Sequence, residues 1–203
     1  MANQPLTAEE ARGKDTNSIL AGFVDRCPWQ FWDTINQPAA TLAAQYNPFS
    51  NPIGSVDPIT NTQKTKLQTN MRRSNQFPPP QCLIVFAIEV YFASTMQKSD
   101  IDLWIAGCYL EFKIDEKIFH EGFLWQFPAG GGLSGVSTNN AESVYTNGIP
   151  APQYTRRYDG WSRYIAPNQQ FSLSVNFPGT PPTTTGTSQV IFTLDGITDR
   201  SVQ

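Results

Sequence analysis

Alternation of apolar and polar residues in the C-terminal part of the chain constrains its fold most strongly. In "FSLSVNF" (residues 171–177), Phe171, Leu173 and Val175 alternate with serine and asparagine, which is typical of a β-strand with one buried and one solvated face. The segment "QCLIVFAIEVYFAS" is apolar on both faces and predicts a central, covered strand. The segments expected to form strands are residues 81–94, 102–127 with a hairpin, 171–177 and 189–197.

No helical periodicity separates these segments, so we expect a largely antiparallel sheet without βαβ units. The fold class predicted is all-β, an antiparallel β-sandwich of jelly-roll type with an extended, largely irregular N-terminal arm. Long connections at 128–160 and 178–188 favour a jelly roll over an up-and-down barrel, which has tight turns. We assign residues 79–203 to the sandwich domain and residues 1–78 to the arm, which contains short helical turns.

The predicted arm is irregular in pattern but rich in aromatic residues. Its prolines recur at intervals too short for long helices, and its many Asn and Gln residues keep it polar. Its aromatic content is too high for a disordered tail, so we expect the arm to pack on its own sandwich or on a neighbouring copy. The aromatic residues expected to make these contacts are Phe23, Trp29, Phe31, Trp32, Tyr46 and Phe49.

The stretch "WQFPAGGGLSG" (125–135) contains the pattern G-x-G-x-x-G of nucleotide-binding loops. Such a loop needs a helix directly after the glycines, whereas "VSTNNAESVYTNGIP" has no helical spacing and many turn formers. We therefore expect no nucleotide, and interpret the stretch as a loop leaving a strand that ends at Phe127-Pro128. Gly130, Gly131 and Gly132 are expected to permit positive φ and the close approach of a neighbouring chain.

Residues that carry catalysis or bind metals are few. His120 is the only histidine, lies between apolar neighbours, and is interpreted as structural. Asp100 and Asp102 in "KSDID" would need Asp115 or Glu121 to hold calcium, and a D-x-D spacing alone is a weak signal. We favour a polar loop that opens the next strand, and we expect no enzyme activity, no metal and no other cofactor.

A polar turn at Asp115-Glu116-Lys117 divides the predicted hairpin. With Asp115 and Glu116 as the turn residues, Glu111 lies opposite a residue near 120, which sets Glu121 on the other face of the sheet. Glycoside hydrolysis requires two carboxylates that flank one bond, so it is the less favoured alternative function.

The stretch "YDGWSRYI" (158–165) mixes aromatic and basic residues. Trp161 and Tyr164, with Arg157 and Arg163, suit stacking against sugars or contact with another protein. A strand whose arginines reach to solvent is an equally good interpretation. A carbohydrate-binding β-sandwich module is therefore the main alternative to a protein-interaction role.

Charge and cysteine content exclude several other classes. The net charge of −3 does not indicate a protein that binds polyanions. Contact of the arm with nucleic acid or lipid is therefore not indicated by charge, although it stays open. Cys27, Cys82 and Cys108 are too few and too far apart for a disulfide framework or a zinc site. No signal peptide or apolar membrane span is evident, so we expect synthesis in a reducing cytoplasm.

Four stretches together resemble structural proteins of bacteriophage virions, in particular the small single-jelly-roll capsid proteins of tailless phages. They are "TKLQTNMRRSNQFPPPQCLIVFAIEVYF", "LWIAGCYLEFKIDEKIFHEGFLWQFPAGGG", "IAPNQQFSLSVNFPG" and "VIFTLDGITDRSVQ". The resemblance covers residues 65–203 and rests on a strand, a hairpin with a polar turn, a glycine-rich exit and a C-terminal strand. The N-terminal arm departs from it, so a major, minor or decoration role stays open.

This resemblance implies a non-enzymatic virion subunit that self-assembles through its arm and loops. It implies copies of the same chain and other virion proteins as partners, no small-molecule substrate, and a location in the virion after synthesis in the host cytoplasm.

Overall fold

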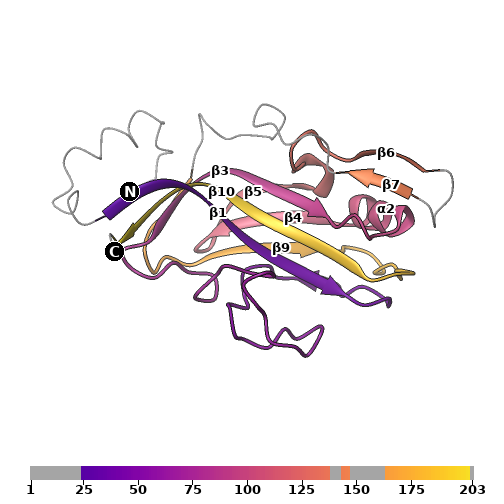
Figure 1. The fold of residues 1–203 in the computed structure, drawn as a ribbon, viewed down its shortest axis with the longest axis horizontal. Helices are drawn as coiled ribbons and strands as arrows, with labels where there is room; N and C mark the ends of the chain where they lie inside the picture. The colour runs from indigo at the N-terminus through magenta and orange to yellow at the C-terminus, as the bar shows by residue number, and fades with distance from the viewer. Residues whose placement is uncertain (1–23, 138–142, 147–162, 202–203) are drawn as a thin grey trace.

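The computed structural model describes residues 24–137, 143–146 and 163–201. Two antiparallel four-stranded sheets pack face to face and form a β-sandwich (Figure 1). This confirms the predicted all-β, antiparallel sandwich. Strands β6 (Ser134–Ser137) and β7 (Ser143–Thr146) form a separate, small two-stranded sheet.

The first sheet has the strand order β1-β10-β3-β8. Its strands are β1 (Val24–Gln37), β10 (Ser188–Ser201), β3 (Cys82–Phe92) and β8 (Arg163–Ile165). The predicted central strand is β3, which lies between β10 and β8 and is buried along most of its length. The strand that is apolar on both faces is therefore covered on both faces in the structure, as predicted.

The second sheet has the strand order β2-β9-β4-β5. Its strands are β2 (Gln45–Tyr46), β9 (Phe171–Asn176), β4 (Tyr109–Ile114) and β5 (Lys117–Phe123). The predicted hairpin is the β4–β5 pair, and Asp115 in its turn has a φ of +53°. Because β5 is last in the order, it forms one edge of this sheet.

Four antiparallel pairs relate the early strands of the sandwich to the late ones. Of its eight strands, the first pairs with the last (β1 with β10), the second with the seventh (β2 with β9), and the third with the sixth (β3 with β8). The fourth and fifth strands, β4 and β5, pair with each other. The chain is thus arranged as one long hairpin, folded over so that its pairs fall alternately in the two sheets.

The core lies between the two sheets. Phe171, Leu173 and Val175 of β9 are fully buried, as their alternation predicted, and Leu110 and Phe112 of β4 are buried beside them. The facing sheet contributes buried side chains from all four of its strands, among them Phe31, Ile35, Ile88, Val90, Ile165, Val190, Phe192 and Leu194.

The predicted boundary at residue 78 is wrong, because the described part of the predicted arm belongs to the sandwich. All fourteen residues of β1 pair with β10, and Phe31 and Ile35 lie in the core. Pro28 is compatible with this strand because β1 is at the edge of its sheet, the position in a sheet where proline is tolerated. The other part of that arm, residues 1–23, lies outside the described residues.

The segment between β1 and β3 is held by buried polar contacts. Asp33 on β1 accepts hydrogen bonds from Lys64 Nζ at 2.7 Å and from the backbone N–H of Phe49 at 2.7 Å. Lys64 Nζ also donates to the carbonyl of Thr34 at 3.0 Å, and both charged side chains are almost completely buried. The same segment contributes Phe49, Met71 and Phe77 to the core.

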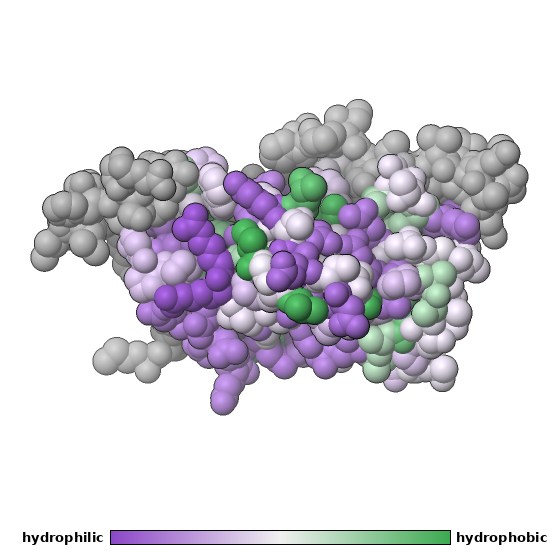
Figure 2. Space-filling model, turned by 60° about the horizontal axis from the view of Figure 1, so that its bottom comes forward, coloured by the Kyte–Doolittle hydropathy of each residue, from purple (hydrophilic) through white to green (hydrophobic). Residues whose placement is uncertain are grey.

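Apolar side chains also remain on the surface of this segment. In Figure 2, the side at the bottom of Figure 1 is turned forward, and hydrophobic residues form separate patches on a mainly hydrophilic face. The segment's large exposed apolar residues are Ile53, Val56 and Leu67, of which Leu67 is 91% exposed. Single exposed apolar residues of this kind are normal on a soluble surface.

The connection between β3 and β4 contains a helix that we did not predict. Helix α2 (Lys98–Gly107) replaces the expected polar loop, and its Trp104 is fully buried against Tyr46 and Phe177. It joins strands of different sheets, so the sheets remain antiparallel despite the helix.

Candidate interaction site at the α2 end of the sandwich

Two exposed aromatic side chains, one residue apart in sequence, lie at the end of edge strand β5 and just after it. Phe123 is 54% exposed and Trp125 is 61% exposed. Their rings stack with centroids 6.4 Å apart and an interplanar angle of 8°. We call these two residues the aromatic pair. Large apolar side chains on an edge strand are unusual, because edges commonly carry charges that prevent association.

The local sequence explains why these two side chains face solvent. The short 3₁₀ helix η2 (Leu124–Gln126) directly follows β5, and the N–H of Phe127 closes its turn on the carbonyl of Leu124 at 3.2 Å. Leu124 is buried and anchors the turn, and Phe127 is buried after it. The two aromatic residues that flank Leu124 therefore point away from the core.

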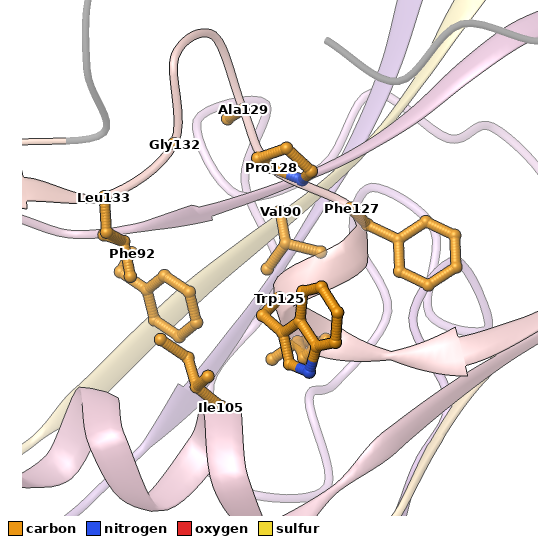
Figure 3. Close-up of a pocket in the computed structure, with 10 residues that line it drawn as sticks. Val90, Phe92, Ile105, Trp125, Phe127, Pro128, Ala129, Gly132 and Leu133 are labelled. Carbon is orange, nitrogen blue, oxygen red and sulfur yellow. The ribbon is translucent and has the colours of Figure 1, made fainter. Parts of the chain in front are cut away.

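An apolar pocket lies beside the aromatic pair, and we call it the α2 pocket (Figure 3). Its volume is about 230 Å³. Its walls are Val90 and Phe92 of β3, Ile105 of α2, Leu124 and Trp125 of η2, and five residues of the loop 127–133. Trp125 belongs both to the aromatic pair and to this wall, so the two features form one continuous apolar surface.

The glycine-rich stretch forms part of the wall of this pocket. Gly130 and Gly132 have φ values of +56° and +81°, as expected for glycines that permit a sharp turn. The N–H of Gly132 donates to the carbonyl of Ala129 at 3.0 Å, and the loop then enters β6. A strand thus occupies the place where a phosphate-binding loop requires a helix.

The expected strand end at Phe127-Pro128 was slightly misplaced, because β5 ends at Phe123 and η2 intervenes. Of the three predicted contact glycines, Gly130 is buried, Gly131 is exposed and Gly132 is half-buried.

Three predicted contact residues are in the core, where a partner cannot reach them. Phe31, Tyr46 and Phe49 are each at most 3% exposed. Their burial corrects the expectation that they act as adhesive residues of an arm, because they complete the apolar interior of their own sandwich. Aromatic residues in an irregular segment can pack in the chain's own core or against a partner, and the sequence alone does not distinguish the two.

Three other predicted contact residues have exposed or half-buried side chains. Trp29 on β1 is 39% exposed, Tyr164 on β8 is 43% exposed, and Trp32 is half-buried. The predicted residues Phe23, Arg157 and Trp161 lie outside the described residues.

Tyr164 joins a polar network that ties β8 to β3 and β10. Its hydroxyl lies near the Cys82 thiol, which donates to Asp199 Oδ2 at 3.4 Å. Arg26 on β1 binds Asp199 with two hydrogen bonds, at 2.6 and 2.8 Å. The Arg26 guanidinium holds the pKa of Asp199 below its usual value, and burial raises the pKa of the Cys82 thiol to about 11.

The aspartates considered for calcium make structural contacts. Asp100 is buried and accepts hydrogen bonds from the backbone N–H groups of Thr185 and Gly186, at 2.9 and 2.8 Å. Asp102 forms an ion pair with Lys98 one helical turn away, and Asp115 accepts a hydrogen bond from Gln169. Within residues 24–137, 143–146 and 163–201, no cluster of three metal-ligating side chains is present.

The predicted register of the β4–β5 hairpin is wrong. Glu111 lies directly opposite Glu121 on the same face, because a bulge at Ile118 and Phe119 shifts the pairing by one residue. Glu111 forms a 2.5 Å ion pair with Lys113, and Glu121 is exposed. The acid of a glycosidase lies in a buried site without a cation beside it, whereas Lys113 contacts Glu111 and solvent reaches Glu121.

His120 lies on the inner side of edge strand β5, opposite Phe112. The two rings stack with centroids 6.4 Å apart at an angle of 16°. Arg163 of β8 lies over the ring of nearby Phe119, 5.0 Å from its centroid, and so connects the edges of the two sheets. The basic and imidazole groups of this region therefore contact aromatic rings of the sandwich.

No helix of the described residues is long and apolar enough to cross a membrane. Comparison of the chain with protein-family models, with curated proteins and with solved structures gave no match.

Proposed function

We propose that this chain is a non-enzymatic structural protein of a bacteriophage virion, a capsid or capsid-associated subunit whose copies associate with one another. We further propose that its sandwich is of the jelly-roll type. The pairing of first strand with last, second with seventh, third with sixth and fourth with fifth supports this proposal, because a long hairpin rolled into two sheets gives that order.

The aromatic pair carries the proposal of self-association. An edge strand that ends in two exposed stacked rings buries apolar surface readily when another chain covers it. The pocket beside it extends this apolar surface around the α2 end of the molecule. When a neighbouring subunit covers this surface, apolar area is removed from water, and the free energy of that burial favours association.

Light scattering and electron microscopy of the purified full chain test this proposal. We expect oligomers, rings or particles, and we expect a Phe123→Ser/Trp125→Ser double variant to shift the distribution toward monomer. Leu67→Ser is the matched control, because Leu67 is more exposed than either aromatic residue but lies in the segment between β2 and β3.

The control variant is expected to assemble like the unmodified chain. A full-length chain that stays monomeric at high concentration would contradict the proposed function. Assembly that is unaffected by the double variant would contradict only the role of the aromatic pair and would leave the proposed function standing.

A carbohydrate-binding module is the second candidate function, and the aromatic pair also favours it. The rings stack beside Glu121, which lies two residues from Phe123 on the same side of the strand and offers a hydrogen-bond acceptor. Binding of the monomeric protein to a glycan array, lost in Trp125→Ser, would support this candidate over self-assembly.

A further inference from the structure

The α2 pocket exceeds the voids of a close-packed interior. Its volume of about 230 Å³ compares with roughly 30 Å³ for one water molecule in the liquid. Apolar cavities of about 150 Å³ are already large enough to take up benzene. A molecule larger than a single aromatic ring therefore fits the available space.

The walls determine which chemistry the pocket accepts. Every side chain on them is aliphatic or aromatic, including Phe92, Ile105 and Leu133. A buried water needs two to four polar partners and a charged group needs a counter-charge, whereas the indole N–H of Trp125 is the one polar group that these side chains carry. The lining thus selects an uncharged apolar molecule.

The pocket is preformed by backbone contacts of its glycine-rich wall. The N–H of Val90 donates to the carbonyl of Phe127 at 2.9 Å, and Val90 and Pro128 form an isolated parallel bridge. Ile105 projects toward the opposite wall from α2 (Figure 3). A wall fixed in this way loses little conformational freedom when a ligand enters.

We propose that the α2 pocket is a binding site for an uncharged apolar molecule, the size of a bicyclic aromatic ring or the end of an alkyl chain. This inference does not depend on the proposed virion role. A free aromatic compound and a lipid-like chain share the required chemistry, and separate probes distinguish these two sources.

Isothermal titration of the full chain with indole and, separately, with 1-octanol tests the proposal. We expect saturable binding of one probe at a single site, and at least tenfold weaker binding in Ile105→Trp, whose indole ring fills the pocket. Ile53→Trp is the matched control, because Ile53 is exposed on the segment between β2 and β3 and lines no wall of this pocket.

The probe that binds identifies the source, indole for a ring and octanol for a chain. Binding of neither probe up to its solubility limit, or equal binding by the two variants, would overturn the proposal. If Ile105→Trp lacks the circular dichroism of the native fold, Leu133→Phe fills the same space from the loop.

Discussion

Gly196 in β10 lies at a bulge where β10 meets β3. The register shifts between Asp195 and Gly196, and a Cβ at position 196 would lie 2.0 Å from the carbonyl oxygen of Ile84. That oxygen belongs to the backbone of a central strand and cannot move alone. We predict that Gly196→Ala lowers the free energy of unfolding by about 3 kcal/mol, measured by denaturant titration.

Gly179→Ala is the matched control for this change, because no atom lies within 4 Å of a Cβ at that position. It should unfold at nearly the same denaturant concentration as the unmodified protein. Equal midpoints for both variants would show that β3 and β10 can separate at the bulge without loss of stability.

Asp199 gives the fold a defined response to acid. Hydrogen bonds from Arg26 are the main cause of its lowered pKa in the folded state. A carboxylate with a lowered folded pKa stabilises the protein above its unfolded pKa of about 3.9, and this contribution is lost as the pH falls through the folded value.

The thermal stability of Asp199→Asn should therefore fall less steeply than that of the unmodified protein as the pH decreases from 5 toward 3. Melting curves at several pH values measure this difference. Parallel curves over that range would contradict the assigned role of the Arg26–Asp199 pair.

At the scale of elements, the Asp33–Lys64 ion pair fastens the segment between β2 and β3 to β1. Burial raises the pKa of Asp33, and the nearby Lys64 ammonium opposes that rise. Lys64→Met removes the cation and leaves a buried carboxylate with only its hydrogen-bonding partners. We predict a loss of about 3–5 kcal/mol in the free energy of unfolding at pH 7.

The double variant Asp33→Asn/Lys64→Met tests whether charge causes this loss. The asparagine side chain introduced at position 33 keeps an oxygen to accept the hydrogen bond from the N–H of Phe49 and carries no charge. We expect the double variant to recover most of the lost stability in the same denaturant titration. A double variant as unstable as Lys64→Met would locate the loss in packing instead of charge.

Elements with one purely apolar face were predictable from sequence, and elements with a polar residue in the core were not. Strands β9 and β4 bury Phe171, Leu173 and Phe112 in strict alternation, which the sequence displays directly. Strand β1 buries Phe31 and Ile35 with the charged Asp33 between them, so its inward face does not look apolar. Lys64, which forms the ion pair with Asp33, is 31 residues away in the sequence. Sequence periodicity carries no information over that separation.

Helix α2 and the hairpin bulge were missed for different reasons. Ile101, Trp104 and Ile105 have the i, i+3, i+4 spacing of a helix, but the window is only ten residues long. The bulge adds one residue to β5, and no glycine or proline marks it in the sequence. The aromatic pair was overlooked because Phe123 and Trp125 belong to an apolar run that looks uniformly buried.

At the scale of the whole molecule, the first and last strands form one pair. Val24 lies opposite Ser201 and Gln37 opposite Ser188, so the two ends of the described chain lie side by side (Figure 1). If β1 were removed, β10 would keep a partner only on the side that faces β3. The described N-terminal strand is therefore part of the cooperative fold.

Two truncations test this arrangement. Deletion of residues 2–23 removes none of the described strands, so we expect the shortened chain to melt cooperatively. Deletion of residues 2–37 also removes β1, with the core side chains Phe31 and Ile35 and the buried Asp33. It exposes the long edge of β10 and leaves Lys64 without its carboxylate, so we expect a chain that aggregates or shows no cooperative thermal transition. Circular dichroism melting curves distinguish the two truncations, and a cooperative transition after the longer deletion would mean that β1 is an arm after all.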